Sequence, residues 1–158
     1  MADASAFNRG MDQWLQAAVQ RADQRMQAIV TEAFNRIVAR TPVDTGFLRA
    51  NWRIVVNGSP PQGTIQNTRD TIFSTPPSVP ITSLSVKAGD IAIIYNRTEY
   101  ARYVEEGTSR MPGRHMVRLT IMEMRAKYGS IIAAPSGGRT SNGRVTAAVS
   151  MRGKGRGA

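Results

Sequence analysis

Residues 29–52, IVTEAFNRIVARTPVDTGFLRANW, contain three successive signals that decide the fold: a helix, its end and a strand. Apolar residues at intervals of three and four indicate one face of a helix, namely Ile29, Val30, Phe34, Ile37 and Val38. Pro42 cannot continue a helix and pushes the residue before it toward extended geometry. The helix is therefore predicted to end near Arg40.

The same apolar spacing extends upstream to about Gly10, so one long amphipathic helix is predicted over residues 10–40. The additional members of the stripe are Met11, Trp14, Leu15, Val19 and Met26. The stripe is wide, and we expect it to cover a sheet or another helix. Acidic and basic residues mix on the opposite face, which disfavours a helix lying on a membrane surface.

A turn and a strand are predicted downstream of Pro42. Asp44 and Thr45 can bond to nearby backbone amides, and Gly46 can adopt a positive φ angle. Residues 51–56 then alternate, with Trp52, Ile54 and Val56 on one side, which is typical of a strand with one buried face.

The middle of the chain, residues 57–89, is rich in proline and glycine and is predicted to be an inserted loop arm. Loops of this length in a compact domain usually serve a function or dock on a partner. Residues 90–96, DIAIIYN, are apolar enough to form a central strand.

Two further helices are predicted after that strand. The first covers residues 98–105, with Tyr100, Tyr103 and Val104 facing inward. A loop at 107–113 leads to the second, residues 112–128, where Pro112 occupies the first turn. Its apolar face is expected to consist of Met116, Leu119, Thr120 and Met124.

These elements predict an α+β fold. A small, mainly antiparallel sheet of three or four strands is packed by the long N-terminal helix and the 112–128 helix. Residues 1–128, including the 57–89 arm, are predicted to form one domain, and residues 129–158 a basic tail rich in glycine and arginine. A chain of 158 residues can bury one core without a metal or disulfide.

Composition narrows the function classes. The chain has no cysteine and one histidine, which excludes thiol catalysis, cysteine-ligated zinc and disulfides. No apolar run of about 18 residues occurs, so we expect a soluble protein made in a reducing cytoplasm and no membrane contact. The net charge is +10, and the cations beyond residue 129 are Arg139, Arg144, Arg152, Lys154 and Arg156. These five can contact DNA or a partner protein, and the sequence leaves both open.

Candidate catalytic groups are weakly supported. The acidic residues Asp44, Asp90, Glu99, Glu105 and Glu106 could hold magnesium in a nuclease, but their spacing matches no metal motif. The simpler interpretation is that Asp44 caps a turn and that Glu105 and Glu106 end a surface helix. His115 could act as a general base beside Arg114, but no partner is fixed by spacing. We therefore predict no catalytic residue, no metal and no cofactor.

Two motifs carry a resemblance to a known family. Residues 41–52, TPVDTGFLRANW, and residues 100–109, YARYVEEGTS, resemble the signatures of phage minor tail or neck proteins, the tail-completion family named for gene product ten of a lambdoid phage. Residues 116–120, MVRLT, resemble the family's following helix. The similarity spans roughly residues 10–128.

The resemblance implies a structural virion protein and no enzyme. Family members are expected to form a ring, usually sixfold, that caps the tail tube and joins it to the head connector. The implied partners are sister copies and other neck, connector and tail-tube proteins, with genomic DNA passing through the bore. A free DNA-binding protein that uses the basic tail is the alternative.

Large amphipathic side chains and arginines are the candidate contact residues of such a ring. Trp52, Tyr100 and Tyr103 could anchor an interface, although Trp52 and Tyr103 could equally be core residues. Forked bonds to carboxylates of a neighbour could come from Arg102, Arg110 and Arg114.

Overall fold

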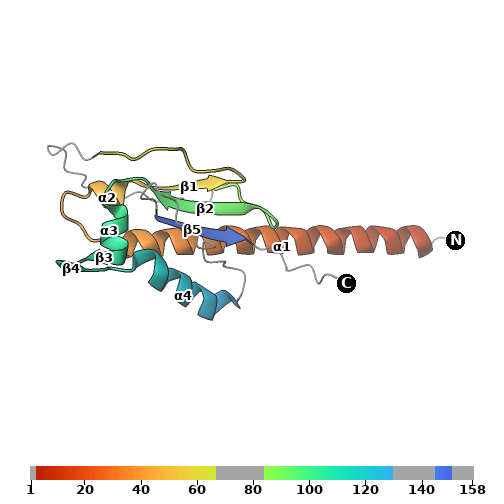
Figure 1. Cartoon of the computed structure of the whole chain (residues 1–158). Helices are drawn as coiled ribbons and strands as arrows, with labels where there is room; N and C mark the ends of the chain where they lie inside the picture. The colour runs from red at the N-terminus through yellow and green to blue at the C-terminus, as the bar shows by residue number, and fades with distance from the viewer. Residues whose placement is uncertain (1–2, 67–83, 130–144, 151–158) are drawn as a thin grey trace, which may run out of the picture.

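The computed structural model describes residues 3–66, 84–129 and 145–150 and has the predicted α+β fold (Figure 1). In chain order its elements are α1 (Asp3–Arg40), α2 (Phe47–Ala50), β1 (Trp52–Val56), β2 (Ile91–Asn96), α3 (Ala101–Glu106), β3 (Gly107–Thr108), β4 (Met111–Pro112), α4 (Met116–Tyr128) and β5 (Val145–Ser150).

The main sheet has three antiparallel strands in the order β1-β2-β5. Trp52 pairs with Asn96 between β1 and β2, and Ile94 pairs with Ala147 between β2 and β5. β5 lies inside the range predicted as the basic tail, and the prediction included no strand there. β1 pairs with one edge of β2, and β5 supplies the backbone hydrogen-bond partners for the other edge, which makes β2 the central strand.

The core forms where the C-terminal half of α1 meets the sheet and α4 (Figure 1). Its largest fully buried side chains include Phe34, Trp52, Ile94, Met116 and Met124. The helix ends at Arg40, as Pro42 predicts, and Trp52 lies on the buried side of its strand.

The N-terminal half of α1 extends beyond this core (Figure 1). We call residues 4–20 the free half of α1. Its apolar side chains are exposed: Phe7 by 67%, Met11 by 48%, Trp14 by 62%, Leu15 by 56% and Val19 by 51%. The expectation that the whole stripe is covered within the chain is therefore wrong. A 38-residue helix is roughly 57 Å long, whereas a six-residue strand spans only about 20 Å, so the sheet can cover only part of it.

The predicted arm at 57–89 is anchored to the body at both described ends. Val86 is buried in the core, and Gln27 Nε2 donates a hydrogen bond to the Leu84 carbonyl oxygen over 2.5 Å. On the other side, Asn57 Nδ2 donates to Asp90 Oδ1 over 2.8 Å. Residues 67–83 of the predicted arm lie outside the described residues.

The predictions around α3 and α4 need three corrections. Tyr103 is 58% exposed and does not face inward, and Leu119 is 43% exposed on the outer side of α4. Pro112 is not in a helical turn but in β4, where it pairs with Gly107. α4 begins at Met116, because the short β3–β4 hairpin occupies the preceding residues.

Charged side chains fasten α4 to α1. Glu32 accepts hydrogen bonds from Tyr128 Oη over 2.5 Å, from Lys127 Nζ over 2.9 Å and from Arg36 Nη2 over 2.8 Å. Glu123 is bound by Arg36 and by Arg40. Burial alone would raise the pKa of Glu32, but the three hydrogen bonds outweigh it and lower that pKa from 4.5 to about 2.

This cluster should make stability depend on pH in the acid range. The pKa of Glu32 is lower in the folded state than in the unfolded state, so its contribution is complete above pH 4.5 and disappears as the pH falls toward 2. We expect Glu32→Gln to reduce the free energy of unfolding at pH 7 by about 1 to 2 kcal/mol, allowing for solvent screening. Urea unfolding at several pH values tests this. Variant and wild-type curves that stay parallel between pH 5 and pH 2 would contradict it.

Candidate functional site

The first signature motif is tied to the core through Thr41. The Thr41 hydroxyl donates to the Ile37 carbonyl oxygen over 2.8 Å and accepts the indole N–H of Trp52 over 2.8 Å. The turn that follows is thereby fixed to both α1 and β1. Gly46 has a φ angle of 82°, as predicted, and precedes the single turn of α2.

Asn96, the last residue of β2, connects that turn to the next segment. Its side chain is fully buried. Asn96 Nδ2 donates to the Leu48 carbonyl oxygen over 2.7 Å, and its Oδ1 accepts the backbone N–H of Thr98 over 3.0 Å. Both amide atoms are therefore satisfied, which a buried polar group requires. The result is that the two signature motifs are held side by side.

Glu105, from the second motif, caps the start of α4. Its Oε2 accepts the backbone N–H of Val117 over 3.1 Å, and its Oε1 accepts that of Arg118 over 3.0 Å. Backbone N–H groups in the first turn of a helix lack partners within the helix, and Glu105 supplies one for two of them. A carboxylate there also interacts favourably with the helix dipole. The interpretation of Glu105 as the end of a surface helix is therefore wrong, because its side chain is buried and joins α3 to α4.

Two glycines allow the backbone of this motif to come close to the chain ahead of α4. A Cβ atom on Gly107 would lie 2.5 Å from the Gly113 nitrogen, and one on Gly113 would lie 2.7 Å from the Glu105 carbonyl oxygen. Gly107 also has a φ angle of 88°. Only glycine fits either position without displacing backbone.

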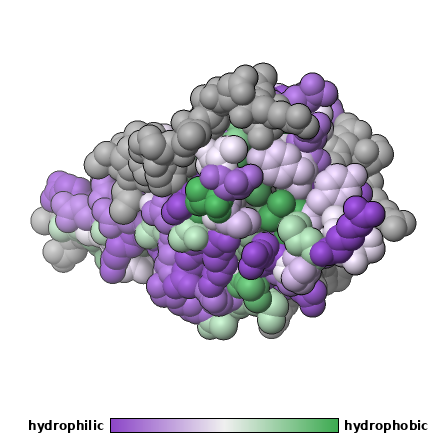
Figure 2. Space-filling view, turned by 90° about the vertical axis from the view of Figure 1, so that its left-hand side faces the viewer, coloured by the Kyte–Doolittle hydropathy of each residue, from purple (hydrophilic) through white to green (hydrophobic). Residues whose placement is uncertain are grey.

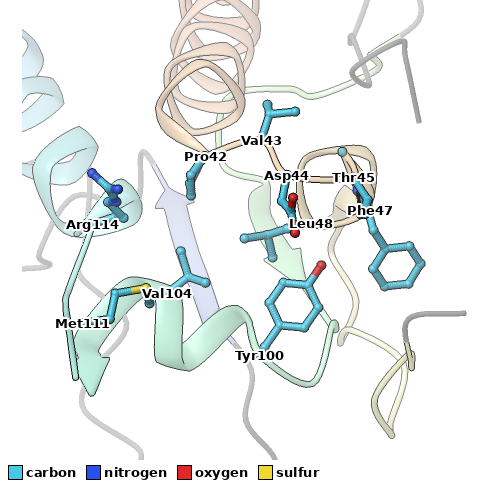
Figure 3. A pocket seen from close by; sticks show the side chains of 11 residues that line it. Pro42, Val43, Asp44, Thr45, Phe47, Leu48, Tyr100, Val104, Met111 and Arg114 are labelled. Carbon is cyan, nitrogen blue, oxygen red and sulfur yellow. Dashed lines mark hydrogen bonds between the residues drawn. The ribbon is translucent and has the colours of Figure 1, made fainter. Parts of the chain in front are cut away.

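The two motifs, together with Met111 and Arg114, line a cavity of about 410 Å³ at the end of the molecule opposite the free half of α1. Figure 2 shows this end, with apolar surface gathered in the middle of the face and hydrophilic surface around it. Figure 3 shows the two walls facing one another. One wall is the 42–48 segment, and the other consists of Tyr100, Val104, Met111 and Arg114.

The cavity combines an apolar wall with a few polar groups. The Phe47 and Tyr100 rings lie 6.5 Å apart between their centroids. Burial raises the pKa of the Tyr100 phenol, and the negative charge of Asp44 adds to this, while a hydrogen bond with the Leu48 backbone opposes it. Tyr100 therefore remains a neutral hydrogen-bonding group at physiological pH.

Most of the predicted contact residues lie at this end. Tyr100 and Arg114 line the cavity, Tyr103 is exposed on α3, and Arg110 is exposed in the β3–β4 hairpin. Arg102 forms a surface ion pair with Glu106 over 2.9 Å. Trp52 is a core residue, which was the alternative to an interface role, since it is fully buried and offers no surface to a neighbour.

Five predicted contact residues have no described position, and three exposed apolar residues were not predicted. The candidate DNA or partner contacts lie outside the described residues, namely Arg139, Arg144, Arg152, Lys154 and Arg156. Sequence reasoning missed Phe7, Val43 and Met111 as exposed apolar residues. The length of α1 relative to the strands was the signal that could have revealed the exposed stripe.

The acidic residues do not form a metal site in the part of the chain that the structure describes, where no group of three potential ligands converges. Glu105 caps α4, and Asp90 instead accepts hydrogen bonds from Asn57 Nδ2 and from the Lys87 backbone. Among the described residues, no helix is both long enough and apolar enough to span a bilayer.

Comparison with protein families identifies the chain. Residues 5–107 match the family model described as "Bacteriophage HK97-gp10, putative tail-component". The chain belongs to this family of phage tail components, which confirms the resemblance seen in the two motifs, and it is a structural protein of the phage tail. Comparison with curated proteins and with solved structures finds no match.

Proposed function

We propose that this tail component is a ring-forming neck or tail-completion subunit that joins the phage tail to the head connector. The observation that carries the proposal is the free half of α1, which exposes five large apolar side chains on a chain of a tail-component family. Apolar stripes of this extent are rarely left in water and indicate an assembly surface. A hexameric ring is what the family resemblance implies for the copies.

In this proposal the chain acts by binding other proteins through complementary surfaces, and it makes or breaks no covalent bond. The partners are sister copies and the neighbouring neck, connector and tail-tube proteins. The net charge of +10 suits a bore through which genomic DNA passes, because a basic surface attracts the phosphate backbone.

Removing the protein from the phage tests the proposal. In a phage that cannot make this chain, we expect full heads and complete tails that stay separate in electron micrographs. Adding the purified wild-type protein to those separated parts should restore joined particles. Normally joined particles without the protein would contradict the neck role.

A free DNA-binding protein remains the second candidate because of the charge distribution. Deleting residues 130–158 would also remove β5, so serine replacements at Arg152, Lys154 and Arg156 make a cleaner test. If DNA binding is the function, these replacements should weaken affinity and flatten its salt dependence. If the neck role is correct, head–tail joining depends on the chain even where its affinity for free DNA is unchanged.

A further inference from the structure

Two exposed apolar surfaces lie at opposite ends of the molecule (Figure 1). One is the free half of α1. The other is the cavity end, defined here as the cavity together with Tyr103. The cavity's lining residues Val43 and Met111 are 57% and 38% exposed, and Tyr103 is 58% exposed. The first is the exposed apolar face of a helix, and the second surrounds the cavity between the 42–48 segment and the α3 side.

The free half of α1 has the composition of an interface core. Residues 4–20 contain only two charged residues, Arg9 and Asp12, so their net charge is zero in a chain of +10. The centres of protein interfaces are depleted in charge and enriched in tryptophan, phenylalanine and methionine. Gly10 lowers the helix propensity of this segment. A partner that covers its apolar side chains would stabilise it.

The cavity end has the complementary properties. Its lining is mostly apolar, and its volume of about 410 Å³ is large enough for an aromatic side chain. Neither Arg110 nor Arg114 forms an ion pair with an acidic side chain among the described residues. A basic segment would be repelled by these arginines, whereas the free half, whose net charge is zero, is not. Asp12 lies three residues before Leu15, so the two are neighbours on the helix surface, and Asp12 can pair with Arg110 or Arg114.

We propose that the free half of α1 in one copy docks on the cavity end of the next copy, with Trp14 as the anchor. The proposal rests on the proposed function, since it names the surfaces that join neighbouring subunits. Each copy docks its free half on one neighbour and accepts the free half of the other neighbour at its cavity end. This is a heterologous contact, and such contacts close into a ring when the rotation between copies permits. The mode is that of an apolar helix face laid on a concave apolar surface.

Three single substitutions at exposed positions test the docking by sedimentation velocity. Trp14→Ala removes the anchor, and Val43→Glu places a charge at the cavity end. Met122→Ala is the matched control, because Met122 is an apolar side chain exposed by 58% on α4, away from both surfaces. We expect the first two to weaken self-association at least about tenfold and the control to leave it unchanged. Urea midpoints should stay near the wild-type value in all three.

Mixing the two defective variants makes the test specific. Trp14→Ala keeps a working cavity end, and Val43→Glu keeps a working free half, so together they should form a one-to-one heterodimer. That heterodimer cannot grow, because both of its remaining surfaces carry a substitution. Pairing between two free halves predicts instead that Val43→Glu associates alone and that no heterodimer forms, which would overturn the proposal.

Tryptophan fluorescence supplies an independent measurement. The chain has two tryptophans, of which Trp52 is fully buried and Trp14 is 62% exposed. Acrylamide should quench Trp14 in the Val43→Glu variant but not in the wild-type assembly. Equal quenching of Trp14 in the Val43→Glu variant and in the wild-type assembly would contradict the docking.

The failures of the two proposals are distinguishable. Wild-type protein that joins heads to tails while Trp14→Ala assembles equally well would overturn the docking and leave the neck role standing. Copies that dock as described but join no head to a tail would overturn the neck role alone. A wild-type chain that stays monomeric at about 100 μM overturns the docking, whatever its effect on head–tail joining.

Discussion

Replacing Trp52 by alanine should lower the free energy of unfolding by about 3 to 5 kcal/mol, the largest effect that we expect from one substitution. Trp52 is the largest side chain buried in the core, and its indole N–H is satisfied by Thr41 over 2.8 Å. Alanine leaves a cavity that the surrounding residues fill only in part. A domain of this size has a total stability of about 5 to 15 kcal/mol, so the variant should unfold far more readily.

Trp52→Phe separates packing from the hydrogen bond. It keeps an aromatic ring in the core but loses the N–H that Thr41 accepts, so we expect a cost of about 1 to 2 kcal/mol. Urea unfolding followed by circular dichroism gives both values. If the alanine variant lost less than about 1 kcal/mol, Trp52 would not be a core residue, and an interface role for it would be open again.

Local signals in the sequence predicted the elements whose geometry depends on a few adjacent residues. Pro42 ended the helix at Arg40, and Gly46 took a positive φ angle. The alternation that starts at Trp52 gave a strand, and the apolar run at 90–96 gave the central strand. In each case the stereochemistry of the backbone or the alternation of side chains was sufficient.

Features that depend on distant residues were not predictable in this way. The stripe on α1 has one spacing along its length, but only the half that meets the sheet and α4 is buried, and the spacing itself does not mark which half that is. β5 forms because β2 has an open edge, which no pattern within residues 145–150 indicates.

The candidate site shows the same division. Its two motifs were recognised as separate segments, and several residues chosen for their chemistry, including Tyr100 and Arg114, do line the cavity. Their convergence depends on Asn96 and Glu105, whose partners lie 48 and 12 or 13 positions away in the chain. Spacing within a motif contains no information about such contacts.

Replacing Glu105 by alanine should have the second largest effect, with a loss of about 2 to 4 kcal/mol in the free energy of unfolding. One carboxylate accepts the backbone N–H groups of Val117 and Arg118 over 3.1 and 3.0 Å, and its side chain is buried. Hydrogen bonds to a charged group each contribute about 1.5 to 3 kcal/mol, and alanine leaves both amides without that partner. Glu105→Gln should fall in between, because its amide oxygen can accept one N–H while its NH₂ group faces the other.

The adjacent carboxylate provides the matched control for this prediction. Glu106 is exposed and paired with Arg102 at the surface, so Glu106→Ala should cost less than about 1 kcal/mol. Amide hydrogen exchange locates the damage: in Glu105→Ala, protection should fall first at Val117 and Arg118. Since α4 is also held to α1 through Glu123 and Lys127, we expect its last turns to keep more protection than its first. Equal losses for Glu105→Ala and Glu106→Ala would show that the cap does not hold α4 in place, because only the buried carboxylate reaches the helix.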